Sequence, residues 1–152
     1  MTKRITGEFA KLQKNKEGWF TVGTYSDDIY QWKVIINGPE NSPYEGGKFE
    51  VKITLPKEYP HKPPMLVVMT KVYSPIVNPE DHTICHPILQ TDNEPGNWAP
   101  TSSVYEVLVA FRSMLGSLST DHVSDTEVAQ VLAERPEEFK KTAREWTKLY
   151  AK

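Results

Sequence analysis

Proline dominates the middle of this 152-residue chain, and its placement limits the folds that the chain can adopt. All but one of the 12 prolines lie between Pro39 and Pro100. Because proline fixes φ and lacks a backbone N–H, it is excluded from helix interiors and from central strands. The middle of the chain is therefore expected to form short strands joined by rigid turns.

Apolar side chains in the first half of the chain predict an antiparallel sheet. Residues 19–25, 30–37 and 49–55 are rich in aromatic and β-branched side chains, and the second and third of these segments alternate with period two, as half-buried strands do. Residues 65–69 predict a fourth strand. Residues 70–101 show no period, and irregular segments of this length inside a compact domain are often functional.

Helices are expected at both ends of the chain. Ile5 and Leu12 share one face of a helix predicted over residues 2–14, and a longer apolar stripe predicts a helix over residues 104–118. Proline suits the first turn of a helix, so a last helix is predicted to begin at Pro136. Its inner face is expected to consist of Phe139, Ala143, Trp146 and Tyr150.

A further short helix is predicted before Pro136, because Ser124 and Glu127 have the spacing of a capping box. The predicted order is an N-terminal helix, a four-stranded antiparallel meander, a long loop and C-terminal helices. Strands and helices segregated in this way predict the α+β fold class. The length predicts one domain covering residues 1–152.

Charge and composition limit the expected partners. The 18 basic and 20 acidic residues give a net charge of −2, whereas a nucleic-acid binder needs a strongly basic face, so no nucleic-acid partner is expected. The chain has no apolar run long enough to cross a membrane and no signal-peptide core at its start. We therefore expect no membrane partner and a cytoplasmic, or alternatively nuclear, location.

Cys85 is the only cysteine, and it lies inside the long proline-flanked loop. A lone cysteine is often a small buried hydrophobic residue, but a rigid loop is also where a nucleophile is displayed. His82 and His86 flank the thiol, which raises two other hypotheses: a zinc site and a cysteine–histidine hydrolase. The zinc hypothesis lacks nearby ligands in the sequence, so no metal is expected, and the hydrolase hypothesis has no partner assigned by spacing.

Several blocks of sequence in a fixed order carry a family resemblance. They are Asn37-Gly38-Pro39-Glu40-Asn41-Ser42-Pro43-Tyr44-Glu45-Gly46-Gly47-Lys48-Phe49, Leu55-Pro56-Lys57-Glu58-Tyr59-Pro60-His61-Lys62-Pro63-Pro64, Ile84-Cys85 with Ile88-Leu89, and Trp98-Ala99-Pro100. From end to end the chain resembles the ubiquitin-conjugating enzymes, the E2 family. The resemblance implies that Cys85 accepts ubiquitin or a ubiquitin-like protein from an E1 activating enzyme as a thioester. Transfer to a substrate lysine then follows, with or without a RING/U-box or HECT E3 ligase. It implies no cofactor on this chain, because E1 uses the ATP.

The sequence departs from the family where an asparagine is expected to support the loop or the oxyanion. The family's His-Pro-Asn is here Ser74-Pro75-Ile76, and isoleucine has no side-chain donor. Asn78 is the nearest substitute in sequence, with Asn97 or His122 as alternatives. Residues 90–97 look like an acidic insertion that caps the thioester side or is merely a tolerated surface loop.

Other roles follow from the resemblance alone. Asp121 and His122 match a region that positions or deprotonates the lysine. The remaining matched positions are Lys3 and Arg4 for E1, and His61, Lys62, Ala99 and Pro100 for the ligase. The lost asparagine keeps a second hypothesis open, a non-catalytic E2-variant module that binds ubiquitin or an active E2.

Overall fold

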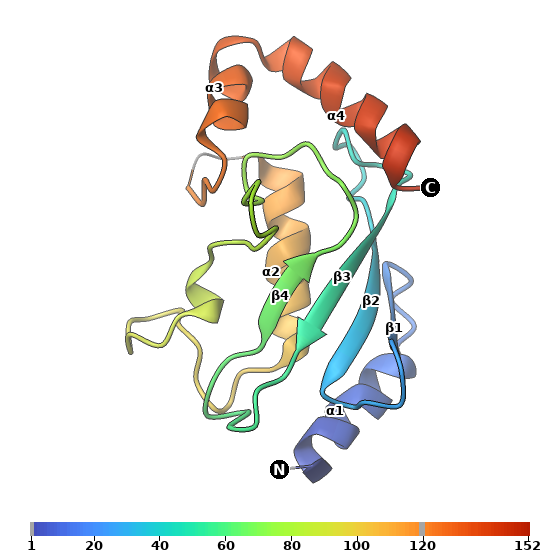
Figure 1. Cartoon of the computed structure of the whole chain (residues 1–152), viewed down its shortest axis with the longest axis vertical. Helices are drawn as coiled ribbons and strands as arrows, with labels where there is room; N and C mark the ends of the chain where they lie inside the picture. Colours follow the sequence, from blue (N-terminus) through green and yellow to red (C-terminus); the bar gives the residue numbers. More distant parts are fainter. Residues whose placement is uncertain (1, 119–120) are drawn as a thin grey trace.

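A computed structural model of the chain describes residues 2–118 and 121–152, and it has the predicted α+β architecture (Figure 1). Four antiparallel strands form one sheet in the order β1-β2-β3-β4, as a meander. Helix α2 lies across one face of the sheet, α1 lies beside β1, and α3 and α4 lie at the end opposite to α1 (Figure 1). The elements are α1 Thr2–Gln13, β1 Phe20–Thr24, β2 Gln31–Asn37, β3 Lys48–Thr54, β4 Met65–Val68, the 3₁₀ turn η1 Pro87–Leu89, α2 Val104–Ser117, α3 Thr126–Glu134 and α4 Pro136–Tyr150.

The predicted alternation sets which side chains of the sheet face the core. In β2, Trp32, Val34 and Ile36 are fully buried, and β3 aligns Ile53 with Trp32 and Val51 with Val34. Since successive side chains of a strand point to opposite faces, this register gives the sheet one apolar face. The indole N–H of Trp32 donates to the carbonyl of Ile29 in the turn before β2, which satisfies the polar atom of this buried side chain.

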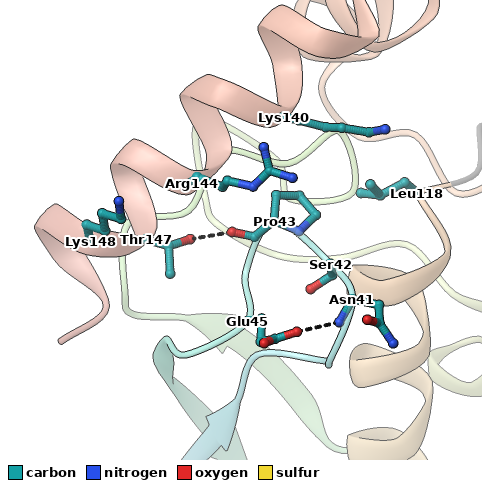
Figure 2. A pocket seen from close by; sticks show the side chains of 9 residues that line it. All are labelled: Asn41, Ser42, Pro43, Glu45, Leu118, Lys140, Arg144, Thr147 and Lys148. Carbon is teal, nitrogen blue, oxygen red and sulfur yellow. Dashed lines mark hydrogen bonds between the residues drawn. The ribbon is translucent and has the colours of Figure 1, made fainter.

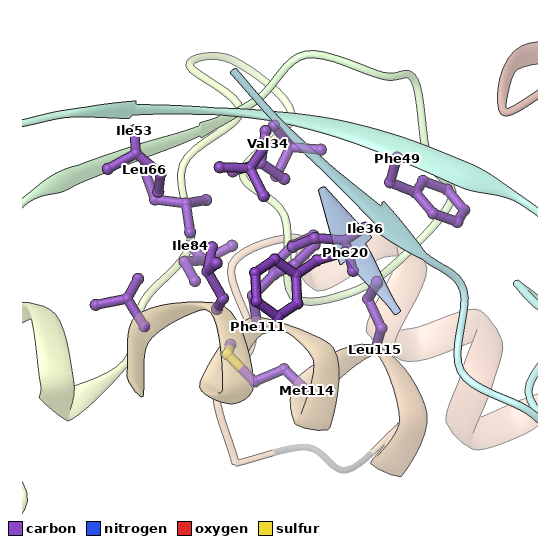
Figure 3. Close-up of a cluster of buried hydrophobic side chains, with 14 of the residues drawn as sticks. Phe20, Val34, Ile36, Phe49, Ile53, Leu66, Ile84, Phe111, Met114 and Leu115 are labelled. Carbon is purple, nitrogen blue, oxygen red and sulfur yellow. The ribbon is translucent and has the colours of Figure 1, made fainter. Parts of the chain in front are cut away.

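Helix α2 covers that apolar face. Val107, Leu108 and Phe111 are fully buried, which confirms the predicted stripe. Figure 3 shows Phe111, Met114 and Leu115 of α2 facing side chains of all four strands. At the helix start, the side chain of Ser103 accepts the N–H of Glu106.

Helix α4 closes the other end of the molecule. Its buried side chains are Phe139, Ala143 and Thr147, and the chain after it pairs with β3, because Lys48 donates its N–H to the carbonyl of Ala151. The predicted inner face is wrong at Tyr150, whose side chain is 46% exposed. Its ring lies instead against the side of the helix, over the ammonium of Lys71 and beside Trp146.

The predicted start of the helix before Pro136 is also wrong. The side chain that caps α3 belongs to Asp125, which accepts the N–H of Val128, and not to Ser124. The backbone N–H groups of Ser124 and Asp125 both donate to the carbonyl of Pro75. With these two bonds, the cap of α3 lies one residue later than the capping-box spacing predicts. They also attach the segment before α3 to the long loop.

No helix in residues 2–118 and 121–152 is long and apolar enough to cross a membrane.

Candidate functional site

Cys85 lies at the surface because its neighbour is buried. Ile84 is 8% exposed and forms an isolated antiparallel bridge with Val77, whereas the thiol of Cys85 is exposed. Figure 3 places Ile84 among the core side chains between the sheet and α2. The carbonyl of His82 accepts the N–H of Val68, so the segment before the cysteine is also fastened to β4. The loop is therefore anchored in the core at Ile84 and exposes the sulfur of Cys85 to solvent.

The segment after Cys85 is held by a turn and a buried indole. His86 caps η1, since its Nδ1 accepts the N–H of Ile88 at 3.0 Å. Gln90 then accepts the N–H of Trp98 at 2.9 Å, and the Trp98 indole donates to the carbonyl of Pro60 at 2.7 Å. Trp98 is 5% exposed, so this side of the loop is anchored in the interior as well.

Two polar side chains approach the thiol region. The amide Nε2 of Gln90 donates to the Cys85 sulfur at 3.8 Å. The imidazoles of His86 and His122 stack with their centroids 4.9 Å apart. Partial burial, and to a smaller extent the charge of His122, lowers the pKa of His86, so the ring beside Cys85 is favoured in its neutral form.

Gln90 was missed by the sequence analysis. The available signal was a polar side chain with two N–H donors at the first position of the inserted segment 90–97. Five residues separate it from Cys85, and only the η1 turn brings the two side chains together. The contact weakens the hydrolase hypothesis, because the side chain that donates to the sulfur is an amide and not an imidazole.

The position that diverges from the family is buried. Ile76 is 2% exposed and Ser74 also 2%, and the Ser74 hydroxyl accepts the N–H of Ile76. Asn78 uses its side-chain oxygen to accept the N–H groups of Glu80 and Asp81, so it shapes a turn. Its role as an oxyanion donor stays a prediction.

The other alternative, Asn97, is engaged within its own loop. Its Oδ1 accepts the N–H of Glu94, and its Nδ2 donates to the carbonyl of Pro87 at 3.2 Å. These bonds close the inserted segment at its base. Of the alternatives considered from sequence, His122 is the one that the fold brings into ring contact with a neighbour of Cys85.

The residues matched to E1 and ligase surfaces meet through Arg4. Its guanidinium donates to the carbonyl of Pro100 at 3.0 Å and of Ser102 at 2.6 Å, and its Nε pairs with Glu8 at 2.8 Å. The pKa of Arg4 is raised, chiefly by the hydrogen bond to Glu8. The other matched residues are surface residues: Lys3, His61 and Lys62 are exposed, Ala99 is half-buried, and Asp121 lies exposed before α3.

Within the described parts of the chain, no group of three or more histidine, cysteine or acidic side chains could hold a metal ion.

A separate hollow of about 480 Å³ lies between α4 and the loop 41–45 (Figure 2). Lys140, Arg144 and Lys148 line it from α4, with Glu45 opposite them accepting the N–H of Asn41. Its lining comes from residues 41–45, 118 and 140–148 of the described chain, so Cys85 takes no part in it.

The fold and the site together define a small α+β domain with a meander sheet, a covering helix and a surface thiol on a proline-rich loop. Comparison with known proteins gives the family. A family model described as ubiquitin-conjugating enzyme matches residues 4–147. The chain is 37% identical to ubiquitin conjugating enzyme E2 B of Dictyostelium discoideum, over 99% of this chain and 97% of that protein. It is also 37% identical to ubiquitin-conjugating enzyme E2 1 of Schizosaccharomyces pombe, over 99% of this chain and 67% of that protein.

Solved structures agree with this assignment. The E2 domain of a Toxoplasma gondii ubiquitin conjugating enzyme superposes with a TM-score of 0.88 at 30% identity, covering 99% of both chains. A putative ubiquitin conjugating enzyme from Plasmodium yoelii gives 0.89 at 29% identity, over 99% of this chain and 94% of that one. The chain belongs to the ubiquitin-conjugating enzyme family.

Proposed function

We propose that Cys85 accepts the C-terminal carboxyl group of ubiquitin or a ubiquitin-like protein from an E1 enzyme and passes it to a lysine amine. The observation that carries this proposal is the exposed thiol on a loop that is anchored in the core on both sides. A folded protein's tail can reach such a sulfur, and the loop need not unfold to receive it. Membership of the family makes acyl transfer through a thiol the chemistry to test first.

Both steps of the proposed reaction are acyl transfers through a tetrahedral intermediate. In the first, the Cys85 thiolate attacks the E1 thioester carbonyl, and the E1 thiolate leaves. In the second, a lysine nitrogen attacks the Cys85 thioester, the C–S bond breaks, and the amine proton passes to a base or to water. We propose that no cofactor is held on this chain, since the thioester received from E1 already stores the energy of the ATP that E1 consumed.

The proposed partner surfaces lie on two neighbouring regions. Lys3 and Arg4 of α1 are proposed for E1, and the loops carrying His61 and Pro100 are proposed for an E3 ligase. Arg4 bonds to the carbonyl of Pro100, so the two surfaces adjoin. We propose His122, whose ring is stacked on that of His86, for guiding the incoming lysine, with Asp121 as the alternative. The proposed location is cytoplasmic or nuclear.

The non-catalytic alternative has less support. Its basis is the missing asparagine, and Ile76 is buried with no donor to offer. Against it stand the exposed Cys85 and the match to proteins named as conjugating enzymes over 99% of the chain. We therefore propose the carrier as the function.

The test is a charging reaction with E1, ATP and ubiquitin, read on a non-reducing gel. We expect one band shifted by a single ubiquitin that disappears with thiol reducing agent, and no such band for Cys85→Ala. Cys85→Ser should instead give an oxyester band that resists the thiol. If neither ubiquitin nor any ubiquitin-like protein charges the chain, the carrier proposal is wrong and the binding module remains.

A further inference from the structure

The oxyanion formed at the Cys85 thioester needs a hydrogen-bond donor, and the family's usual position cannot supply one here. Ile76 occupies that position, lies 2% exposed in the interior and has no polar side-chain atom. A preorganised donor commonly accounts for about 10²–10³ of an acyl-transfer rate. If this protein transfers ubiquitin at an ordinary rate, another residue must donate the hydrogen bond that Ile76 cannot supply.

The candidate donors near the loop differ in what they already bind. Asn97 uses its Nδ2 donor on the carbonyl of Pro87, and the side chain of Asn78 is oriented by the N–H groups of Glu80 and Asp81, which its Oδ1 accepts. The Nδ1 of His86 accepts the N–H of Ile88, so only the Nε2–H of this ring can donate, and the ring is stacked on His122. The amide of Gln90, by contrast, donates directly to the reacting atom, with Nε2 3.8 Å from the Cys85 sulfur.

The backbone of Gln90 is fixed at the point from which its side chain reaches the sulfur. Its N–H donates to the carbonyl of Pro87 at 2.9 Å, and its carbonyl accepts the N–H of Trp98 at 2.9 Å. Trp98 is itself buried and bonded to the carbonyl of Pro60. The fixed backbone limits the positions that the exposed Gln90 side chain can take to those near the sulfur, and a donor already near the reacting group favours oxyanion stabilisation.

The position of the Gln90 amide also suits the negative charge that develops on the thioester carbonyl oxygen. In the thioester the carbonyl oxygen is two bonds from the sulfur, so a donor in hydrogen-bond contact with the sulfur reaches that oxygen by a small rotation of its side chain. We propose that Gln90 is the oxyanion donor of this protein and replaces the missing asparagine. This inference rests on the proposed thioester chemistry at Cys85.

The role covers one step of the reaction. When the lysine nitrogen attacks the thioester carbon, the C=O π pair moves onto oxygen, and the Nε2–H of Gln90 donates to that oxygen. As the intermediate collapses, the pair returns to the C=O bond, the C–S bond breaks, and Cys85 leaves as the thiolate. Gln90 neither gains nor loses a proton at any stage.

The inference is tested by single-turnover discharge of the charged full-length chain. The wild type and each variant are charged with ubiquitin, further charging is stopped by removing ATP, and loss of the thioester is followed at a series of free lysine concentrations. For Gln90→Ala we expect the limiting rate to fall by about tenfold. This effect is smaller than the loss of a donor from a solvent-excluded site, because water can partly replace an exposed donor. The lysine concentration for half-maximal rate should change little, since the lost bond forms only in the transition state.

Two variants of similar length separate a donor role from a structural one. Gln90→Glu keeps the chain length but offers only acceptor oxygens, so it should discharge as slowly as Gln90→Ala or more slowly. Gln90→Arg keeps N–H donors and should stay within about threefold of the wild type. Thr91→Ala, in the same exposed loop, is the matched control and should discharge at the wild-type rate.

The outcomes are distinguishable from a failure of the proposed function. If the wild type forms no thioester at Cys85, the carrier proposal itself fails. If charging is normal but the glutamate and arginine variants discharge at equal rates, or Gln90→Ala discharges like the wild type, Gln90 is no oxyanion donor and the carrier proposal stands. Thermal melting of each variant identifies any loss of rate that comes from unfolding.

Discussion

At the scale of single residues, burial decides which side chains near Cys85 can act. Ile84 and Ile76 point into the core at 8% and 2% exposure, whereas Cys85 is exposed between them and the η1 turn. A buried side chain adjacent to an exposed thiol fixes the thiol's direction, since neighbouring extended residues face opposite ways. Ile76, which stands where the family has an asparagine, is therefore a core residue that contributes to packing.

Restoring the family's asparagine should therefore cost stability and leave the discharge rate no faster. Ile76→Asn removes buried apolar surface and inserts an amide without a designed partner, for which we expect a loss of about 2–4 kcal/mol in unfolding free energy. Urea denaturation measures this loss, with Ile76→Val as the control at about 0.5–1.5 kcal/mol. Wild-type stability combined with faster lysine discharge would show that the asparagine side chain reaches the thioester.

At the scale of elements, one carboxylate joins three segments of the fold. Glu8 of α1 accepts the N–H of Val104 at the start of α2 at 3.0 Å, the hydroxyl of Tyr59 at 2.6 Å and the Nε of Arg4 at 2.8 Å. Burial, and then the hydrogen bond to Glu8, raises the pKa of Tyr59, which stays a donor. These bonds attach the helix proposed for E1 to both loops proposed for the ligase.

Glu8→Ala should loosen this junction. Three donors lose their acceptor, and water can satisfy them in part, so we expect a loss of about 1–3 kcal/mol in unfolding free energy. Glu58→Ala is the matched control, because Glu58 is exposed and its contact with Lys62 is 3.9 Å long, a pair typically worth about 0–1 kcal/mol. Equal denaturation midpoints for the two variants would mean that the junction contributes nothing to the fold.

At the scale of the whole molecule, the C-terminal end is docked onto the start of the sheet. Lys48 bonds to Ala151, and Thr147 of α4 lies against Gly47 just before β3. A Cβ at Gly47 would lie 2.6 Å from the Cγ2 of Thr147 and 2.9 Å from the ring of Phe49, so no side chain fits there. The ammonium of Lys71 lies 4.8 Å from the ring centroid of Trp146, which joins the long loop to α4 as well.

Gly47→Ala should therefore separate α4 from the sheet. Overpacking of this kind costs about 1–3 kcal/mol, and we expect a corresponding fall in the urea midpoint. Gly23→Ala in β1 is the control, since its added Cβ meets no atom within 4 Å, and its effect should stay within about 0.5 kcal/mol. The docking argument fails if the two alanine variants are equally stable.

Local pattern was sufficient to predict the four strands and the four α-helices of this chain, although not the η1 turn or the cap of α3. Period-two alternation determines β2 and β3 because one face must be buried, and the helical stripe of α2 follows from the same demand. The order of strands and helices then gives the α+β class, and the motif blocks between residues 37 and 100 give the family resemblance. None of these needs information from distant parts of the chain.

Contacts between distant parts of the chain decided the rest. The N–H groups of Ser124 and Asp125, just before α3, bond to the carbonyl of Pro75, and the ring of Tyr150 lies against Lys71 of the long loop. The stacking of His86 on His122 joins the long loop to the segment before α3, and Trp98 anchors the backbone of Gln90, whose side chain the η1 turn brings to the Cys85 sulfur. Loop geometry of this kind has no sequence period, because it is fixed by hydrogen bonds and buried anchors that the sequence does not place side by side.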